Sequence, residues 1–121
     1  MQVQYPITFL YYNDLESATR FYGEVLGLNL WRDQGFCKIF HVGEAAYVGL
    51  VDGEKGSLRP TAEKGVLLTF VVDDVKRWHT YLESQKVDDL TPIHVNEDIG
   101  VTGFFFKDPE GYTLEIQVFL S

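Results

Sequence analysis

The stretch that decides the fold is ITFLYYNDLESATRFYGEVL, residues 7–26, because the chain repeats its pattern as LLTFVVDDVKRWHTYLESQK, residues 67–86. Each copy runs from a β-rich apolar segment through an acidic turn, Asn13-Asp14 or Asp73-Asp74, into apolar residues at helical spacing. Two copies of one supersecondary unit in a chain of 121 residues predict an internally duplicated fold. The interface between the halves of such a fold is the natural place for a ligand pocket.

The first copy predicts a strand at residues 7–12 and then a helix. Asp14 can accept hydrogen bonds from the backbone N–H groups of the first helical turn, and Gly27 supplies the left-handed residue that ends the helix near Leu26. We expect Phe21 to pack beneath this helix. Three further strands, separated by turns at Gln34-Gly35 and Gly43-Glu44, are predicted at residues 29–33, 36–42 and 45–51.

The second copy predicts the same order again. Asp73 or Asp74 caps a helix from Val75 to about Gln85. The turn Asp108-Pro109-Glu110-Gly111 closes the last hairpin, because proline suits the second position of a type I turn and glycine the left-handed position after it. The strands of this half are predicted at residues 66–72, 91–95, 103–107 and 113–120.

The order βαβββ–βαβββ indicates an α+β protein built from two similar modules, each a curved sheet with a helix on its outer face. A chain of 121 residues can bury one core but not two independent ones, so we expect a single domain. A polar segment rich in glycine and proline connects its halves. The expected parts are module 1 at about 5–52, a linker at about 53–64 and module 2 at about 65–121.

The composition excludes several classes of function. The net charge is −8, with 10 basic against 18 acidic residues, so we expect no nucleic acid and no anionic membrane as partner. The acidity favours solubility, and it would attract a cationic ligand over long range. No apolar run approaches the roughly 20 residues that span a bilayer. A single cysteine, Cys37, and a start without a secretory pattern point to the cytoplasm.

Two motifs resemble those of a known family. The pattern D-L-x-x-x-x-x-F-Y stands at residues 14–22, and D-P-x-G-x-x-x-E stands at residues 108–115. Together they resemble the vicinal oxygen chelate superfamily, which contains glyoxalases, bleomycin-resistance proteins and extradiol dioxygenases. The resemblance covers nearly the whole chain. It implies two βαβββ modules that form a partly open curved β-barrel around a ligand cavity, with the helices outside, and often a homodimer.

The resemblance also implies where a metal would bind. The family's ligand positions fall on Ile7 and Leu67, where metal-dependent relatives commonly carry histidine, on a residue near Gly49, and on Glu115. Only Glu115 offers a donor, and one carboxylate cannot hold a metal that needs about three protein ligands. We therefore expect no metal and no other cofactor. Glu115 remains either a catalytic general base or an inherited acid that a neighbouring tyrosine or backbone donor satisfies.

Strand alternation extends these positions to a list of pocket residues, because side chains on one face recur at every second position. The opposite face should pack beneath the helices through Leu10, Tyr12, Phe70, Val72, Leu114, Ile116 and Val118. Trp31 could line the pocket, line a dimer crevice or belong to the core. The predicted ligand pocket is Ile7, Phe9, Tyr11, Trp31, Tyr47, Gly49, Leu67, Thr69, Thr113, Glu115 and Gln117.

The histidines and the cysteine fit structural roles better than functional ones. His79 lies on a helix face that we expect to be exposed, and Cys37 is expected to be a buried, inert thiol. His41 borders the turn at Gly43 and His94 begins a polar loop, so either could face the cavity and complete an atypical metal site.

Three functions remain open. The first is a metal-independent binding protein of the bleomycin-resistance type, which as a homodimer sequesters one aromatic small molecule. The negative charge of the chain favours a cationic ligand of this kind. The second is a lyase or isomerase that uses Glu115 as general base or as a ligand of an atypical metal site. The third is a vestigial or regulatory domain whose own side chains fill the pocket.

Overall fold

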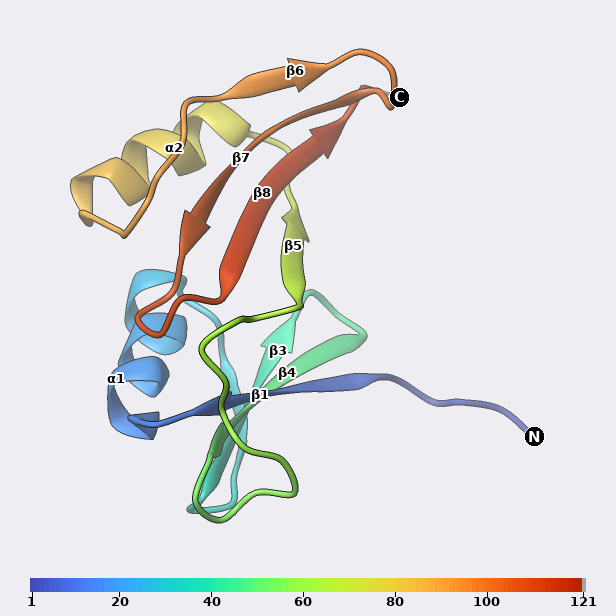
Figure 1. Ribbon diagram of the computed structural model, residues 1–121. Helices are drawn as coiled ribbons and strands as arrows, with labels where there is room; N and C mark the ends of the chain where they lie inside the picture. The colour runs from blue at the N-terminus through green and yellow to red at the C-terminus, as the bar shows by residue number, and fades with distance from the viewer. Residues whose placement is uncertain (121) are drawn as a thin grey trace. The chain divides into compact units, whose positions relative to one another are not determined.

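The computed structural model describes residues 1–120 and divides the chain into two compact units, Met1–Ala62 and a second unit that begins at Glu63. Each unit has one helical segment and four strands in the order βαβββ (Figure 1). The predicted α+β class and the internal duplication are therefore confirmed. Among the described residues, no helix has the length and apolar character needed to cross a membrane.

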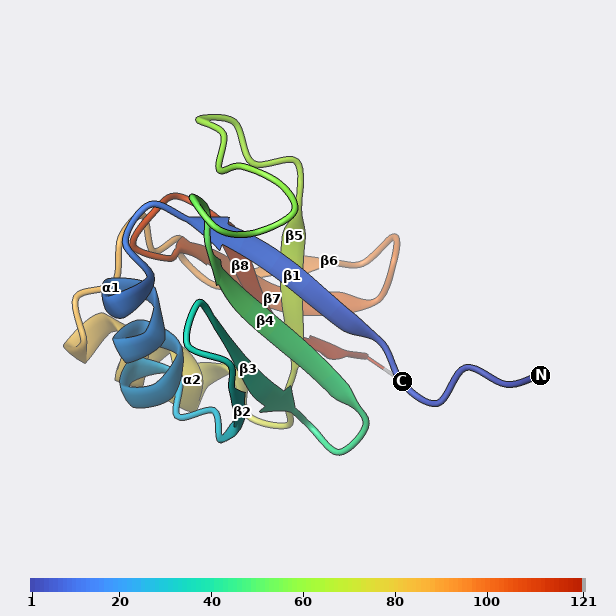
Figure 2. The ribbon, with the colours of Figure 1, turned by 90° about the horizontal axis from the view of Figure 1, so that it is seen from below.

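The first unit is a mixed sheet with a helix on one face. Its elements are β1 Ile7–Tyr12, α1 Leu15–Arg20, the π-helical turn η1 Phe21–Val25, β2 Leu30–Asp33, β3 Cys37–Val42 and β4 Ala46–Asp52. The tight turns make β2, β3 and β4 an antiparallel meander, and β1 adds to β4 in parallel. The strands therefore lie side by side in the order β1-β4-β3-β2 (Figure 2).

The second unit repeats this plan. Its elements are β5 Leu67–Val71, α2 Val75–Ser84, β6 His94–Asn96, β7 Val101–Lys107 and β8 Thr113–Phe119. The strand order is β5-β8-β7-β6, with β5 parallel to β8 and the other pairs antiparallel (Figure 1). Neither sheet closes on itself, so each has two edge strands.

Equivalent aspartates begin the two helices. Asp14 Oδ1 accepts from the backbone N–H of Ser17 at 3.1 Å, and Asp74 Oδ1 accepts from that of Arg77 at 3.0 Å. These bonds satisfy donors that the first helical turn leaves without a partner in the helix. The structure thus selects Asp74, and not Asp73, as the cap of α2.

The first helix departs from the expected regular form. Only residues 15–20 are α-helical, and the next five residues form a π-helical turn in which the Leu26 N–H donates to the Phe21 carbonyl oxygen at 3.0 Å. A π-helical turn contains one residue more than an α-turn, which shifts the residues that face the sheet. Gly27 ends the helix with φ +72°, as predicted.

The helix-covered faces form the cores of the units. Leu10, Tyr12, Leu114 and Ile116 are fully buried, as the alternation predicted, whereas Phe70, Val72 and Val118 are half-buried. The Tyr12 hydroxyl donates to the Tyr22 hydroxyl at 3.1 Å and so links β1 to the helix. Phe21, which we expected beneath the helix, is only half-buried, whereas its neighbour Tyr22, which follows Ala18 at helical spacing, is fully buried.

A buried aspartate organises the last hairpin. Asp108 is 1% exposed, and its Oδ1 accepts from the backbone N–H groups of Glu110 at 2.9 Å and Tyr112 at 3.0 Å. The Gly111 N–H donates to the Asp108 carbonyl oxygen at 3.1 Å, and Gly111 has φ +90°, so the predicted turn is confirmed.

One predicted strand is shorter than expected. The strand at residues 91–95 is regular only over His94–Asn96. Pro92 has no N–H to donate to a ladder, so Thr91 makes isolated bonds to Phe105 through its N–H and its hydroxyl oxygen.

The first prediction compares the two adjacent aromatic residues of η1. Tyr22→Ala should lower the free energy of unfolding by about 3 to 5 kcal/mol, because it removes a fully buried ring. Phe21→Ala should cost clearly less, since Phe21 keeps part of its surface in water. Chemical denaturation measures both values, and equal losses would contradict the assigned packing of η1.

Candidate functional site

Each sheet has one face without a helix. In the first sheet this face, here called the first open face, carries the odd-numbered residues of β1, because the Tyr12–Tyr22 bond places the helix on the even-numbered side. The strand register puts Ile7 beside Tyr47, Phe9 beside Gly49, and Tyr11 beside Val51. On β3 the same face carries Cys37, Ile39 and His41.

Four rings gather at one end of the first open face. This aromatic cluster consists of Tyr5, Trp31, His41 and Tyr47. The centroid of the Tyr47 ring lies 4.3 Å from that of Trp31, 4.9 Å from that of His41 and 5.0 Å from that of Tyr5. Tyr5 is 40% exposed, and Phe9, four residues further along the same face, is 41% exposed. The cluster therefore offers ring surface from which a planar ligand would displace water.

Two residues of this region, Tyr5 and Arg32, were not among the pocket residues predicted from the sequence. Tyr5 precedes the predicted strand, yet it continues the odd-numbered alternation of Ile7, Phe9 and Tyr11, and that parity could have identified it. The guanidinium carbon of Arg32 lies 4.3 Å from the centroid of the Trp31 ring. A cation already covers part of the indole, so Trp31 supports the cluster more than it offers free stacking surface.

The other end of the first open face is closed. Cys37, Ile39 and Val51 form a buried core cluster, and the partly buried side chains that pack against it are Ile7, Tyr11, Trp31 and Tyr47. The loop after β4 lies close above it, since a Cβ atom placed on Gly56 would be 2.5 Å from Val51 Cγ1. Cys37 is buried as predicted, and burial raises the pKa of its thiol. The accessible part of the face is therefore the aromatic end and the Phe9 side chain.

The corresponding face of the second sheet, here called the second open face, combines apolar residues with several polar ones. The register brings Leu67 beside Thr113, Thr69 beside Glu115, and Val71 beside Gln117. Glu115 is 8% exposed, and its Oε1 accepts from the Thr69 hydroxyl at 2.8 Å. This bond satisfies one carboxylate oxygen and holds the carboxylate in a fixed orientation, and its donor is a threonine hydroxyl in place of the expected tyrosine or backbone group.

Further groups of the second open face were not predicted from the sequence. Lys107 Nζ donates to the Thr113 hydroxyl oxygen at 2.7 Å. Phe105 pairs with Glu115 across β7 and β8. The exposed His94 ring stacks on the Phe105 ring, with the two centroids 5.5 Å apart. Antiparallel pairing with β8 determines which β7 residues share the face, and that register could not be read from β7 alone.

His79 contradicts its predicted exposure. It is half-buried, its Nε2 donates to the Thr91 carbonyl oxygen at 2.9 Å, and its ring meets that of Phe104 edge to face at 4.8 Å. The side chain reaches from α2 to the segment before β6. We expected a structural role for His79 on the solvent-exposed side of the helix, and its contacts show instead that the side chain packs inside the second unit.

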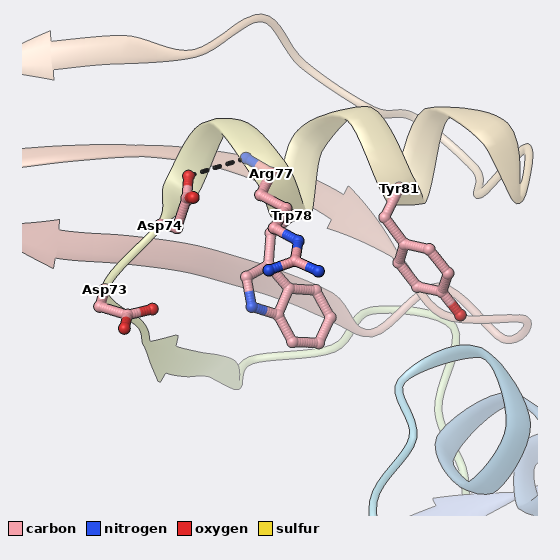
Figure 3. Close-up of a pocket in the computed structure, with 5 residues that line it drawn as sticks. All are labelled: Asp73, Asp74, Arg77, Trp78 and Tyr81. Atoms are coloured by element: carbon pink, nitrogen blue, oxygen red, sulfur yellow. Dashed lines mark hydrogen bonds between the residues drawn. The ribbon is translucent and has the colours of Figure 1, made fainter.

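A surface hollow of about 330 Å³ lies along the first turns of α2 (Figure 3). Trp78 and Tyr81 contribute two rings with centroids 6.1 Å apart, and the remaining lining residues are Asp73, Asp74 and Arg77. The Asp74 carboxylate is already used to cap the helix. The sequence pattern predicted Trp78 and Tyr81 as apolar positions of the helix, and it did not predict a hollow beside them.

The donor set does not fit a metal. Ile7, Leu67 and Gly49 have no donor atoms, which leaves Glu115 alone at the positions that the resemblance implied. Among residues 1–120, no group of three His, Cys, Asp or Glu side chains lies close enough together to hold an ion. His41 contacts the aromatic cluster and His94 stacks on Phe105, so the two histidines belong to different open faces.

Comparison with known proteins identifies relatives of the whole chain. Residues 4–116 match the family model described as Glyoxalase/Bleomycin resistance protein/Dioxygenase superfamily. No curated protein sequence matches significantly.

Among solved structures, the chain is similar to lactoylglutathione lyase from Agrobacterium tumefaciens, with 25% identity and a TM-score of 0.74 over 93% of this chain and 90% of that one. It is also similar to TioX from Micromonospora sp. ML1, with 18% identity and a TM-score of 0.79 over 96% and 98%. A glyoxalase/bleomycin resistance protein/dioxygenase from Nocardioides has 18% identity and a TM-score of 0.79 over 100% and 86%. The last two likenesses show the fold alone.

The second prediction concerns metal content. Protein incubated with Ni, Co, Mn, Fe or Zn should retain less than about 0.1 equivalent in a specific site, because Glu115 has no partner ligands. Elemental analysis after gel filtration measures this, with Glu115→Gln as the matched control. Stoichiometric metal that disappears in the variant would overturn the metal-free account and direct attention to His41 and His94.

Proposed function

The chain belongs to the glyoxalase/bleomycin resistance protein/dioxygenase superfamily, and we propose that it is a metal-independent binding protein that sequesters a planar aromatic small molecule on its first open face. The observation that carries this proposal is the aromatic cluster, whose rings lie within 4.3 to 5.0 Å of the Tyr47 centroid beside the exposed Phe9. The poor fit of the donor set to a metal supports the same proposal.

Binding would follow from the physical character of the face. Burying exposed ring surface removes apolar area from water, and offset or edge-to-face contacts between rings add about 0.5 to 1.5 kcal/mol for each pair. The cluster needs little reorganisation to accept a ligand, because Tyr47 already contacts three other rings. Less conformational entropy is then lost on binding.

Charge should influence the rate of binding more than the choice of ligand. The net charge of −8 attracts cations over long range, as the sequence predicted. Locally, however, the Arg32 guanidinium already lies over Trp31 and repels a second cation at that ring. We therefore place aromatic shape first in the selection of the ligand, and cationic charge second.

An enzyme is the second candidate, and a specific observation supports it. Glu115 is buried and oriented by Thr69, and Thr113, which accepts a hydrogen bond from Lys107, precedes it by two residues on the same face of β8. A positioned carboxylate of this kind can act as a general base in a lyase or isomerase. The similarity to the lactoylglutathione lyase, at 25% identity, favours this reading, whereas the donor set argues against a metal-dependent version of it.

The third prediction tests the binding proposal with 2-naphthol as a neutral fused-ring probe. Tyr5→Ala should weaken binding by about threefold to tenfold, since it removes one ring contact. Tyr81→Ala is the matched control, because Tyr81 is 38% exposed against 40% for Tyr5 but lies in the α2 hollow. Isothermal titration calorimetry in the presence of EDTA measures both affinities.

Two results would contradict the proposal. If Tyr81→Ala weakens binding and Tyr5→Ala does not, the ligand site is the α2 hollow. If only Glu115→Gln abolishes binding, the second open face is the site and the enzyme becomes the leading reading.

A cationic probe, 2-naphthylmethylammonium, should associate several-fold more slowly when salt is added, with dissociation nearly unchanged.

The fourth prediction concerns assembly, which we propose to be a homodimer. β5 is an edge strand, and its Leu67 and Val71 are 50% and 60% exposed, so apolar edge surface is available for a two-fold partner. Light scattering coupled to gel filtration should give twice the mass of 13.9 kDa. A monomer at micromolar concentration would contradict this assembly without affecting the proposed ligand site.

A further inference from the structure

We infer that Phe9 is the stacking platform for the ligand of the first open face, and that Gly49 is glycine because the Phe9 ring occupies the place of its side chain. This inference deepens the proposed function and rests on it. It identifies a specificity-determining pair and favours fused planar ring systems as ligands.

The geometry at Gly49 is unusually close. A Cβ atom placed on Gly49 would lie 2.4 Å from Phe9 Cδ1 and 2.6 Å from Cε1, closer than the roughly 3.0 Å at which real Cβ contacts begin. The two residues are direct partners in the β1–β4 register. The edge of the Phe9 ring therefore fills the space in which any other residue at position 49 would have its side chain.

Backbone conformation does not explain this glycine. The glycines with positive φ are Gly27, Gly35, Gly43, Gly100 and Gly111, and Gly49 is not among them. Glycine within a strand weakens the strand, and it often marks a place where another group approaches the backbone closely. At Gly49 the approaching group is an aromatic ring of the same sheet.

Phe9 remains available to a ligand despite this contact. Gly49 is buried, whereas Phe9 is 41% exposed, so the ring covers the backbone and still presents surface to water. Ile39, the partner of Gly49 on β3, is 2% exposed. Phe9 is thus the exposed aromatic side chain between the closed end of the face and the aromatic cluster.

The position of Phe9 favours a ligand with more than one ring. Gly49, over which the ring lies, is two residues from Tyr47 along β4, a separation of roughly 7 Å. A planar molecule that lies flat across both places covers more aromatic surface when it has two fused rings than when it has one, and it therefore removes more apolar area from water. We assign the ligand to the class of fused bicyclic or larger aromatic molecules, and a single-ring compound should bind more weakly.

A double-mutant cycle tests the platform. Phe9→Ala should weaken 2-naphthol binding by about threefold to tenfold, and Gly49→Ala should do nearly the same, although it removes no ring, because the added methyl group displaces Phe9. In the Phe9→Ala background, Gly49→Ala should have no further effect. Phenol, the single-ring control, should bind the unaltered protein more weakly than 2-naphthol does.

The thermal midpoint of the same variants provides a readout that needs no ligand. Gly49→Ala should lower the midpoint in the unaltered protein, but it should raise the midpoint or leave it unchanged in the Phe9→Ala background, where the space is open. An equal decrease in both backgrounds would overturn the assignment of Gly49 to the Phe9 ring.

The failure of this inference differs from the failure of the proposed function. If Tyr5→Ala weakens 2-naphthol binding while Phe9→Ala and Gly49→Ala do not, the first open face binds the ligand but Phe9 is not its platform. If the unaltered protein binds neither 2-naphthol nor 2-naphthylmethylammonium, the proposed function fails, and the platform inference fails with it.

Discussion

A single helix covers only one face of a four-stranded sheet, and this constraint determines where each unit of the protein can interact with other molecules. In both units the helix begins at an aspartate cap directly after the first strand and packs on the even-numbered side of that strand. Leu10 and Tyr12 are therefore fully buried, while Ile7 and Phe9 keep part of their surface in water. The exposed parts of the uncovered faces are the places where sequence changes alter chemistry without removing the core.

The two open faces show how one repeated unit has acquired two different surfaces. Phe9 beside Gly49 in the first sheet and Thr69 beside Glu115 in the second occupy equivalent places in the pairing of first and last strands. In the first pair an aromatic ring lies over a bare backbone, and in the second a hydroxyl orients a carboxylate. The first surface suits stacking and the second suits polar contacts, so the binding and enzymatic candidates correspond to different halves of the chain.

Much of the fold could be predicted because its signals are local. Caps at Asp14 and Asp74, turns at Gly35 and Gly111, and strand alternation each depend on a few neighbouring residues. The same alternation placed Ile7, Phe9, Tyr11 and Tyr47 on one face. The apolar helix pattern contained both Phe21 and Tyr22, but the interruption of the α-helix at Phe21 could not be predicted, because a π-turn has no distinctive sequence pattern. The contact of Phe105 with His94 depends on strand pairing that periodicity does not encode. Arg32 lies over the ring of its sequence neighbour Trp31 at a place where the β2–β3 register shifts, and regular alternation does not predict such a shift.

The most direct test of the account is a crystal structure of the EDTA-treated protein in complex with 2-naphthol. The account predicts a planar ligand on the first open face, in contact with Phe9 and Tyr47, with no metal ion bound to protein side chains. A ligand bound to Glu115 and Thr69, or a metal ion held by Glu115, would contradict it.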